Sequence, residues 1–364
     1  MLKSIKFQIN AYRESDPWFL EKTEFGNFNL VAGVNSTGKS RMISIINGLA
    51  RFIRNNGLKY LGTWNATFEF DNDTYEYSVY SNLGNELTES LLVNGNLLLE
   101  REGNHAKLFS ETLNEFENFN PPGDSLLLHF RRDQVAYPYL EKLNNWATGV
   151  KFFEFGHLHS YQFNTQYSEG RESISIENIA QILVDEVSDA GIKNIISNFN
   201  QLGYEIEALK GEYVADTPKI LIKERGFTNF IEQRVMSQGM IRSLALLIFI
   251  EYIKESGKYS LVLIDDLAEG MDFKRATLLG KYLNDCIDSS LQFISTSNHD
   301  YFLNQTNIEN WIILHRDGIT VEPIYSKKYP DLFRKFSMSG LAPFDMFTSS
   351  FLKKYMKDED INIR

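Results

Sequence analysis

The stretch Gly33-Val34-Asn35-Ser36-Thr37-Gly38-Lys39-Ser40 fits the phosphate-binding pattern G-x-x-x-x-G-K-S in full. Before it, residues 27–31 form a predicted strand, and after it apolar residues recur at helical spacing. This order directs backbone N–H groups at an anion, because the loop sits at the positive end of a helix. Lysine at its position reaches the terminal phosphates and the serine hydroxyl ligates Mg²⁺. We therefore expect nucleotide phosphates to be bound by Gly33, Asn35, Ser36, Thr37, Gly38, Lys39 and Ser40.

A second chemical feature lies far along the chain, where the apolar residues 261–264 end in Asp265 and Asp266. A carboxylate at the end of a buried strand can hold Mg²⁺ directly or through water. We expect Asp265 to be that ligand; the alternative is an ordinary turn at the strand end. Gln134 is a further candidate contact for Mg²⁺, with a surface helix position as the equally plain alternative.

Three polar loops complete the set of candidates. The first, Met236-Ser237-Gln238-Gly239, opens an apolar helix, and Ser237 would be a good N-cap by itself. The second, Ser297-Asn298-His299, follows the strand 292–296, and these residues could simply cap the turn. The third loop follows the first predicted strand and contains Tyr12 and Arg13. The planar guanidinium of Arg13 suits stacking on adenine, and Tyr12 is the alternative stacking residue.

The periodicity predicts an α/β chain in four parts. Residues 1–110 contain the phosphate-binding loop followed by β-hairpins, and residues 111–225 form a mixed helical and β insert. Residues 226–330 contain the second chemical region, and residues 331–364 form a helical tail. The tail is unusually apolar, which favours core packing, with a docking surface as the alternative.

Composition narrows the class of protein. The net charge of −11 is opposite to that of a general binder of nucleic acid, and the basic doublets Arg131-Arg132, Lys327-Lys328 and Lys353-Lys354 are typical of solvated surface. The N-terminus lacks the apolar stretch of a secretory signal, and no run is long enough to span a bilayer. The single cysteine, Cys286, suits a reducing compartment, so we expect a cytoplasmic protein without membrane contact. His157 and His159 resemble a metal pair, but no further ligand accompanies them, so a polar strand face is favoured.

Together these motifs resemble the ABC-type ATPases of the group that includes RecF, the SMC-like proteins and the ATPase half of the OLD (overcoming lysogenization defect) nucleases. "SQGMIR" at 237–242 is similar to the "SxGxxR" signature, and "LVLIDDLAEGMD" at 261–272 is similar to the group's Mg²⁺ strand. "FISTSNHDYFLN" at 293–304 is similar to its histidine loop, and the stretch from Ile9 to Arg13 is similar to its first strand end, which supports Arg13. The resemblance covers the first 55 residues and about 225–325.

The resemblance implies a fold and roles for these residues. The fold would be an α/β phosphate-loop ATPase head of ABC type with a β-hairpin subdomain and an inserted helical and β lid. Ser237 and Gly239 would bind the γ-phosphate of ATP held by another subunit, and Asp266 would activate the attacking water, with Glu269 as a less suitable alternative. Either Asn298 or His299 would contact the γ-phosphate. Asp266 stands where the group usually has glutamate and Asn298 where it has histidine. Either the backbone at Asp266 lies closer to the γ-phosphate, or the attacking water is held poorly and hydrolysis is slow.

The resemblance also implies partners. ATP and Mg²⁺ would close a homodimer or a larger homo-oligomer. The spacing leaves no room for an SMC coiled coil or for a C-terminal nuclease domain, so the chain resembles a stand-alone ATPase. Such ATPases occur in anti-phage systems beside a separate effector, frequently a nuclease. A RecF-like ATPase that binds DNA in repair, an ATP-binding scaffold with little hydrolysis and a transporter subunit are the rival readings.

Overall fold

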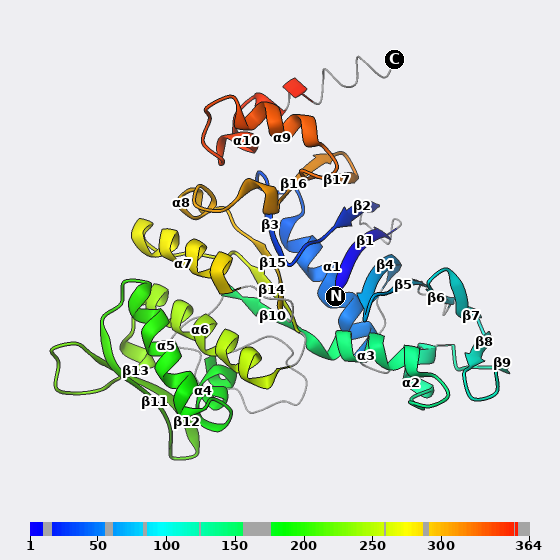
Figure 1. The fold of residues 1–364 in the computed structure, drawn as a ribbon, viewed down its shortest axis with the longest axis horizontal. Coiled ribbons are helices and arrows are strands. Elements are labelled where there is room, and N and C mark those ends of the chain that lie inside the picture. The colour runs from blue at the N-terminus through cyan, green and yellow to red at the C-terminus, as the bar shows by residue number, and fades with distance from the viewer. Residues whose placement is uncertain are drawn as a thin grey trace. The chain divides into compact units, whose positions relative to one another are not determined.

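The computed structural model describes residues 1–9, 17–54, 61–82, 86–123, 125–155, 176–257, 260–286, 291–352 and 354–355. The chain divides into two compact units (Figure 1). Unit 1 contains Met1–Val150, Glu309–Leu341 and Met346–Arg364, and unit 2 contains Lys151–Ile308 and Ala342–Asp345. The predicted insert, residues 111–225, is thus shared between the units. No helix of the described ranges is both long and apolar enough to cross a membrane.

Unit 1 is built on a long sheet with the strand order β3-β16-β17-β2-β1-β4-β5-β6-β7-β8-β9. Strand β3 pairs in parallel with β16, and β17 pairs in parallel with β2, while the pairs from β2 through β1 to β9 are antiparallel. The strands are β1 (Leu2–Ile9), β2 (Trp18–Glu24), β3 (Phe28–Ala32), β4 (Gly62–Phe70), β5 (Asp73–Ser81), β6 (Leu87–Val93), β7 (Asn96–Glu102), β8 (His105–Ser110), β9 (Glu115–Phe119), β16 (Trp311–Asp317) and β17 (Thr320–Ile324).

The strand, loop and helix around the phosphate-binding motif form as predicted. Strand β3 is buried at every position, and α1 (Lys39–Arg54) begins inside the motif. The side chains at the predicted helical spacing are all buried: Met42, Ile45, Ile46, Leu49, Phe52 and Ile53. This apolar stripe packs towards α3 (Pro138–Gly149), and burying it fixes the N-terminal end of α1, where the loop is.

The hairpins predicted for residues 62–110 are also present (Figure 1). At the β4–β5 turn, Asp71 and Asn72 have φ values of +53° and +73°, and at the β6–β7 turn, Asn94 and Gly95 have φ values of +50° and +77°. Two successive positive φ angles are what a tight two-residue hairpin turn requires. The antiparallel run continues past the predicted end of this region, because β9 pairs with β8.

Strand β2 is the main element that the sequence pattern did not predict. Its buried residues are Trp18, Leu20 and Thr23, a spacing that does not alternate. The cause is a bulge in the pairing of β1 with β2, where the register shifts between Ile5 and Phe7. A bulge changes which side chains face the core, so a search for period-two alternation misses the strand.

Unit 2 contains a sheet with the order β10-β14-β15 and a separate antiparallel sheet with the order β11-β12-β13. Strands β14 and β15 are parallel, with Leu261 opposite Gln292 and Ile264 opposite Ser295, so their carboxyl ends meet at one edge. The strands are β10 (Val150–Glu154), β11 (Ile206–Val214), β12 (Thr217–Glu224), β13 (Ile231–Glu232), β14 (Ser260–Asp265) and β15 (Leu291–Thr296). The helices are α4 (Ile176–Asp185), α5 (Asp189–Gln201), α6 (Gln238–Ser256), α7 (Phe273–Cys286) and α8 (Asp300–Leu303).

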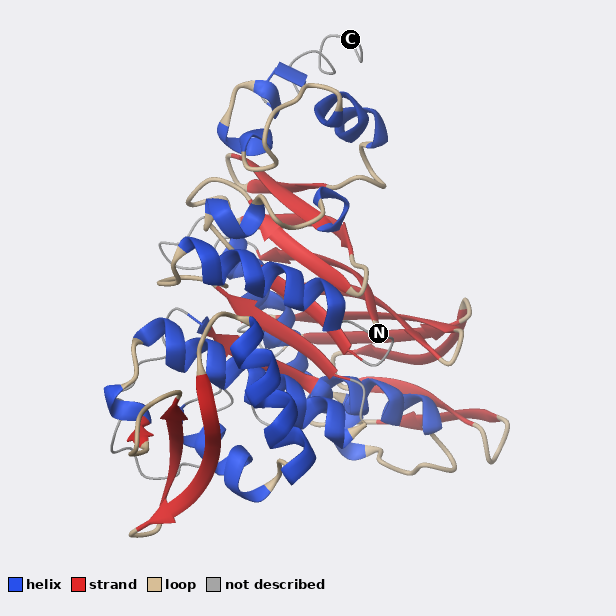
Figure 2. Cartoon of the chain, turned by 60° about the vertical axis from the view of Figure 1, so that its left-hand side comes forward, coloured by secondary structure: helices blue, strands red, loops and turns tan. Residues whose placement is uncertain are grey.

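Helix α6 is the central element of unit 2. From Ile241 to Ile250 every residue is buried, which explains why this stretch carries apolar side chains all round rather than a stripe. Helix α4 packs against α6, β11 and β12, and helix α5 packs against α6 and β11 (Figure 2). The helix therefore holds its first residues, which follow Ser237, in a rigid setting.

The C-terminal tail forms α9 (Pro330–Ser337) and α10 (Asp345–Thr348). Most of its apolar side chains in the described ranges are buried, including Leu332, Phe333, Phe336 and Leu352, whereas Met338 is 83% exposed. Phe347 lies beside Trp311 of β16, and Phe336 meets Phe351 edge-on. Core packing, the default expectation for the tail, is what these contacts show.

Candidate functional site

The phosphate-binding loop of unit 1 has the backbone that its glycines allow. Gly33 and Gly38 have φ values of +145° and +104°, and Ser36 adopts +68°. A Cβ on Gly33 would lie 3.0 Å from the carbonyl oxygen of Leu314, and one on Gly38 would lie 2.9 Å from Trp18. Both glycines are therefore required by conformation and by close approach. The crest of the loop, with Asn35 and Ser36, is exposed and open to a ligand.

Lys39 is the loop's fixed cation. Its side chain is only 7% exposed, and Nζ donates to the carbonyl oxygens of Gly33 at 2.9 Å and Val34 at 3.1 Å. Thr37 also donates to Val34, at 2.9 Å, so the loop is closed by its own side chains. Ser40 follows in the first turn of α1 and is exposed. A buried ammonium beside a helix N-terminus creates a strongly anion-attracting cradle.

In unit 2 the two candidate carboxylates are tied to the end of the neighbouring strand. The Thr296 hydroxyl donates to the Asp265 carboxylate at 2.5 Å and accepts the Asp266 backbone N–H at 2.9 Å. Leu267 N–H then donates to the Thr296 carbonyl at 2.8 Å. Asp266 itself has a φ of +55°, a left-handed conformation that is uncommon for non-glycine residues but that aspartate adopts more readily than most.

Thr296 is the residue of this site that the sequence analysis missed. It ends the strand 292–296, which was predicted, but only the pairing of β15 beside β14 shows that its hydroxyl meets Asp265. The carboxyl ends of adjacent parallel strands meet at one edge, so a polar residue ending one strand is a candidate partner for a carboxylate ending the next. That signal was available and would have found Thr296.

On the expectation from the sequence that the chain hydrolyses ATP and that Asp265 binds Mg²⁺, replacing Thr296 with valine should lower ATP turnover by about 10- to 100-fold, the usual effect of losing a hydrogen bond that orients a metal-binding carboxylate. Valine keeps the shape of threonine but neither holds Asp265 nor accepts the Asp266 N–H. Thr296→Ser keeps the hydroxyl and should retain most of the turnover. Equal turnover in the valine variant and the wild type would show that Thr296 does not position the carboxylates.

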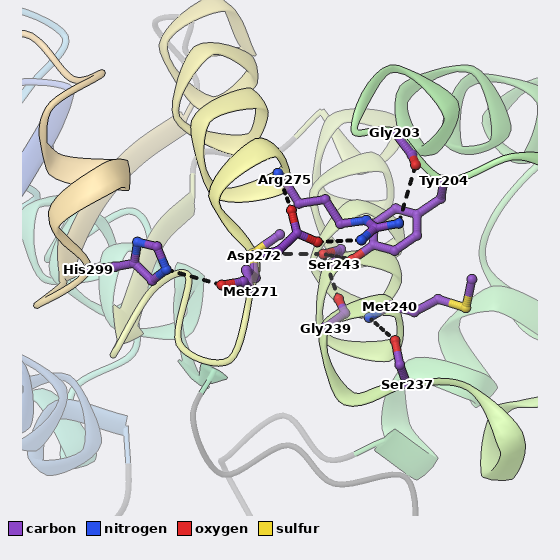
Figure 3. Close-up of polar contacts among 10 residues, drawn as sticks. All are labelled: Gly203, Tyr204, Ser237, Gly239, Met240, Ser243, Met271, Asp272, Arg275 and His299. Atoms are coloured by element: carbon purple, nitrogen blue, oxygen red, sulfur yellow. Dashed lines mark hydrogen bonds and ion pairs between the residues drawn. The ribbon is translucent and has the colours of Figure 1, made fainter.

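The signature loop of unit 2 is held by the start of α6 (Figure 3). Ser237 is exposed and caps the helix, since its Oγ accepts the Met240 N–H at 3.3 Å. A Cβ on Gly239 would lie 3.3 Å from the carbonyl oxygen of Gly270, so the loop that follows the carboxylates lies close beside it. Arg242, buried below, donates to the carbonyl of Glu269 at 2.8 Å. The signature loop and the loop 269–272 thus form one connected surface.

The loop 269–272 is fixed at its other end by a second cluster (Figure 3). Asp272 pairs with Arg275, and the Arg275 guanidinium lies 4.3 Å from the ring centre of Tyr204. The Tyr204 hydroxyl lies 3.4 Å from the hydroxyl of Ser243, which donates to the Gly239 carbonyl at 2.7 Å. These contacts join the loop, α7 and α6, so that a movement of one displaces the others.

The structure assigns His299 to the turn after β15. Its Nδ1 accepts the Phe302 N–H at 3.4 Å, which caps α8, and Nε2 lies 3.1 Å from the Met271 carbonyl oxygen. Because Nδ1 accepts, the proton of the neutral ring is on Nε2, which donates to Met271 (Figure 3). Asn298 is exposed at the end of the same strand. Of the two candidates, Asn298 is the one whose side chain is not committed to capping α8.

Other candidates lie elsewhere. In the short helix α2 (Leu127–Phe130), His129 Nε2 lies within hydrogen-bond distance of the carbonyl oxygens of Phe52 and Ile53. These two residues lie at the end of α1 that is opposite to the phosphate-binding loop. Gln134 comes four residues after the end of α2, and its side chain is exposed. Its neighbour Asp133 lines a cavity together with residues of β8 and β9. The structure therefore does not bring Gln134 to the loop.

Some predicted residues cannot be placed. Tyr12, Arg13, His157, His159 and Lys353 lie outside the described residues. Within the described ranges, no group of three or more His, Cys, Asp or Glu side chains could hold a metal ion by itself.

No family model and no curated protein matches the sequence. Among solved structures, an SMC head bound to the C-winged helix domain of ScpA is similar with a TM-score of 0.54 at 12% identity, covering 89% of this chain and 96% of that chain. A second similar structure is an Smc head domain with an extended coiled coil bound to the C-terminal domain of ScpA, derived from Pyrococcus furiosus. Its TM-score is 0.52 at 12% identity, and the match covers 93% of this chain and 100% of that chain. The predicted fold class is confirmed: the chain has the α/β fold of an SMC head.

Proposed function

We propose that the chain binds and hydrolyses ATP with Mg²⁺ and works as a dimerising switch of the ABC type. The observation that carries this proposal is the phosphate-binding loop, with Lys39 buried beneath an exposed crest and the helix α1 behind it. The residues fit Mg-ATP, because the loop offers N–H groups and an ammonium to phosphates and Ser40 a hydroxyl to the metal. Mg²⁺ would neutralise charge on the β- and γ-phosphates.

Each remaining residue has a role in the proposal. Asp265 holds Mg²⁺ or its water, and Asp266 orients the attacking water, with its main chain fixed by Thr296. Ser237 and Gly239 bind the γ-phosphate of ATP held by a second copy, and the exposure of Ser237 supports this. Asn298 contacts the same phosphate. An aspartate at 266 reaches less far than glutamate, so hydrolysis is slow and the switch stays closed for long.

The proposed biological role is that of a cytoplasmic regulatory or sensor subunit in an anti-phage complex with a separate effector, possibly a nuclease. This part rests on the resemblance of the motifs to stand-alone ATPases of that kind. The connected surface of loop 269–272, α6 and α7 would pass the nucleotide state on to the partner.

A mixing experiment tests whether each ATP is held between two copies, by the phosphate-binding loop of one copy and the signature loop of the other. Lys39→Ala lacks a working phosphate-binding loop, and Ser237→Arg blocks the signature loop with a bulky charge, so each variant alone should be inactive. In a mixed dimer, the Ser237→Arg copy supplies an intact phosphate-binding loop and the Lys39→Ala copy supplies an intact signature loop. These two loops face each other at one of the two sites, so that site is restored. We expect an equimolar mixture to regain up to about one quarter of wild-type turnover, because half of randomly formed dimers are mixed and each has one working site.

The outcomes separate the rival functions. No recovery in the mixture, with wild-type turnover independent of protein concentration, would refute the shared site. Tight ATP binding by the wild type without any turnover would favour the scaffold, for which Asp266 and Asn298 are the specific motivation. Turnover that rises steeply with added duplex DNA and falls with salt would favour the RecF-like repair ATPase.

A further inference from the structure

Arg41, two residues after Lys39, has its guanidinium over the ring of a buried tryptophan. Its guanidinium carbon is 4.4 Å from the ring centre of Trp18, which is only 1% exposed. Side chains near the start of a helix lean back towards its N-terminus, so Arg41 runs towards the phosphate-binding loop. Trp18 also lies against Gly38 of the loop, since a Cβ there would be 2.9 Å from its ring. The tryptophan thus fixes Arg41 relative to the loop.

Arg316, at the end of β16, reaches the same loop from the neighbouring strand. Its Nη1 donates to the Ser36 carbonyl at 3.3 Å, and its Nε donates to the Gly318 carbonyl at 2.8 Å. The close approach of Gly33 to Leu314 keeps β16 against the loop. Arg316 is exposed, so part of its guanidinium remains available to a ligand.

The two arginines approach the same loop, Arg41 through Trp18, which lies against Gly38, and Arg316 through the Ser36 carbonyl. The pKa of Arg41 is lowered, first by burial and then by the positive charge of Arg316. Within the described ranges, no carboxylate forms an ion pair with either guanidinium. Two like charges at one loop are unfavourable until an anion joins them, and arginine is the side chain best suited to hold phosphate.

We propose that Arg41 and Arg316 form a clamp for the phosphate chain of the nucleotide on the loop, in addition to the residues of the phosphate-binding motif. The clamp rests on the proposed function, since the ligand is the same nucleotide. Neither residue belongs to the motif, and they come from α1 and β16, which are separated by most of the chain. Because both guanidinium groups address phosphate oxygens, ATP and ADP should benefit from the clamp and adenosine should not.

The test compares Kd values for ATP, ADP and adenosine in the wild type, Arg41→Met and Arg316→Gln. Methionine keeps an unbranched side chain on Trp18 and removes the charge together with the N–H donors. We expect each variant to bind ATP about tenfold more weakly, the usual loss for one charge-assisted hydrogen bond. The control, Arg334→Gln, removes an exposed arginine of the same unit that pairs with Asp331, and should bind like the wild type.

A second readout separates a clamp from a merely structural role. If Arg41 only supports the fold, Arg41→Met should lower the melting temperature without ligand. For a clamp, that melting temperature stays equal or rises, because a repulsion is relieved, while the increase caused by ATP becomes smaller.

The outcomes also separate the clamp from the proposed function. Unchanged ATP affinity in both variants, with binding reduced in Lys39→Ala, would refute the clamp and leave the proposed function intact. A wild type that does not bind ATP at all would refute both.

Discussion

Replacing Lys39 with alanine is expected to lower ATP turnover by about 10²- to 10³-fold, the usual effect of removing one fixed group that stabilises transition-state charge. The structure explains why this lysine is well prepared for the task. Its ammonium is buried and already fixed by the Gly33 and Val34 carbonyls, so it needs little reorganisation to face phosphate oxygens. Phosphate release under saturating Mg-ATP measures the effect.

The fold of this variant should survive. Val34 keeps a hydrogen bond from Thr37 when Lys39 is removed, and the apolar stripe of α1 is untouched. The melting temperature without nucleotide should therefore change by only a few degrees. Lys6→Ala, which removes an exposed lysine of β1 paired with Glu21, is the matched control and should keep full turnover. A Lys39→Ala protein that hydrolyses ATP within threefold of the wild-type rate would contradict the assignment of the loop.

The contiguous motifs were the part of the site that the sequence could predict. Residues 33–40 specify a loop almost alone, because the required glycines, the lysine and the helical spacing all lie within one short segment. The strand ending in Asp265 was predicted for the same reason, and both form as expected. The fold class followed from their order along the chain, and the similarity to SMC heads confirms it.

Contacts between distant segments could not be predicted in the same way. Arg316 reaches Ser36 only because β16 pairs with β3, and nothing near Arg316 in the sequence indicates that neighbour. The choice between Asn298 and His299 depended on the exact turn after β15, where the ring of His299 caps α8. For Ser237 the structure shows the cap that the sequence allowed, and its binding to phosphate stays a prediction.

Replacing Arg101 with leucine is expected to lower the free energy of unfolding by about 3 to 5 kcal/mol at pH 8, because three carbonyl oxygens lose their charged donor and a buried carboxylate loses a compensating charge. Arg101 is only 1% exposed and donates to the carbonyls of Gly103 at 2.8 Å, Pro122 at 2.7 Å and Ser125. These hydrogen bonds hold the segment before α2 against strand β7. Leucine fills part of the volume but leaves these carbonyls without their donor.

The same substitution removes the nearest positive charge from a buried carboxyl group. Glu89 is 2% exposed and accepts hydrogen bonds from the Tyr77 hydroxyl and the Leu127 N–H, each at 2.9 Å. Burial raises the pKa of Glu89 to about 7, and the Arg101 charge keeps this pKa from rising further. A carboxyl group whose folded pKa is raised gives stability that is present below its unfolded pKa and is lost as the pH rises through the folded value.

The destabilisation by Arg101→Leu should therefore depend on pH, being larger at pH 8, where Glu89 is charged in the wild type, than at pH 5.5, where it is protonated. Urea unfolding at the two pH values measures this, and amide exchange at Leu127 reports the local loosening. Arg132→Leu is the control, because Arg132 pairs with Glu141 but is 57% exposed, and it should change stability by less than about 1 kcal/mol. Equal effects of the two substitutions would show that Arg101 does not hold this part of unit 1 together, and the same effect of Arg101→Leu at both pH values would show that its charge does not act on Glu89.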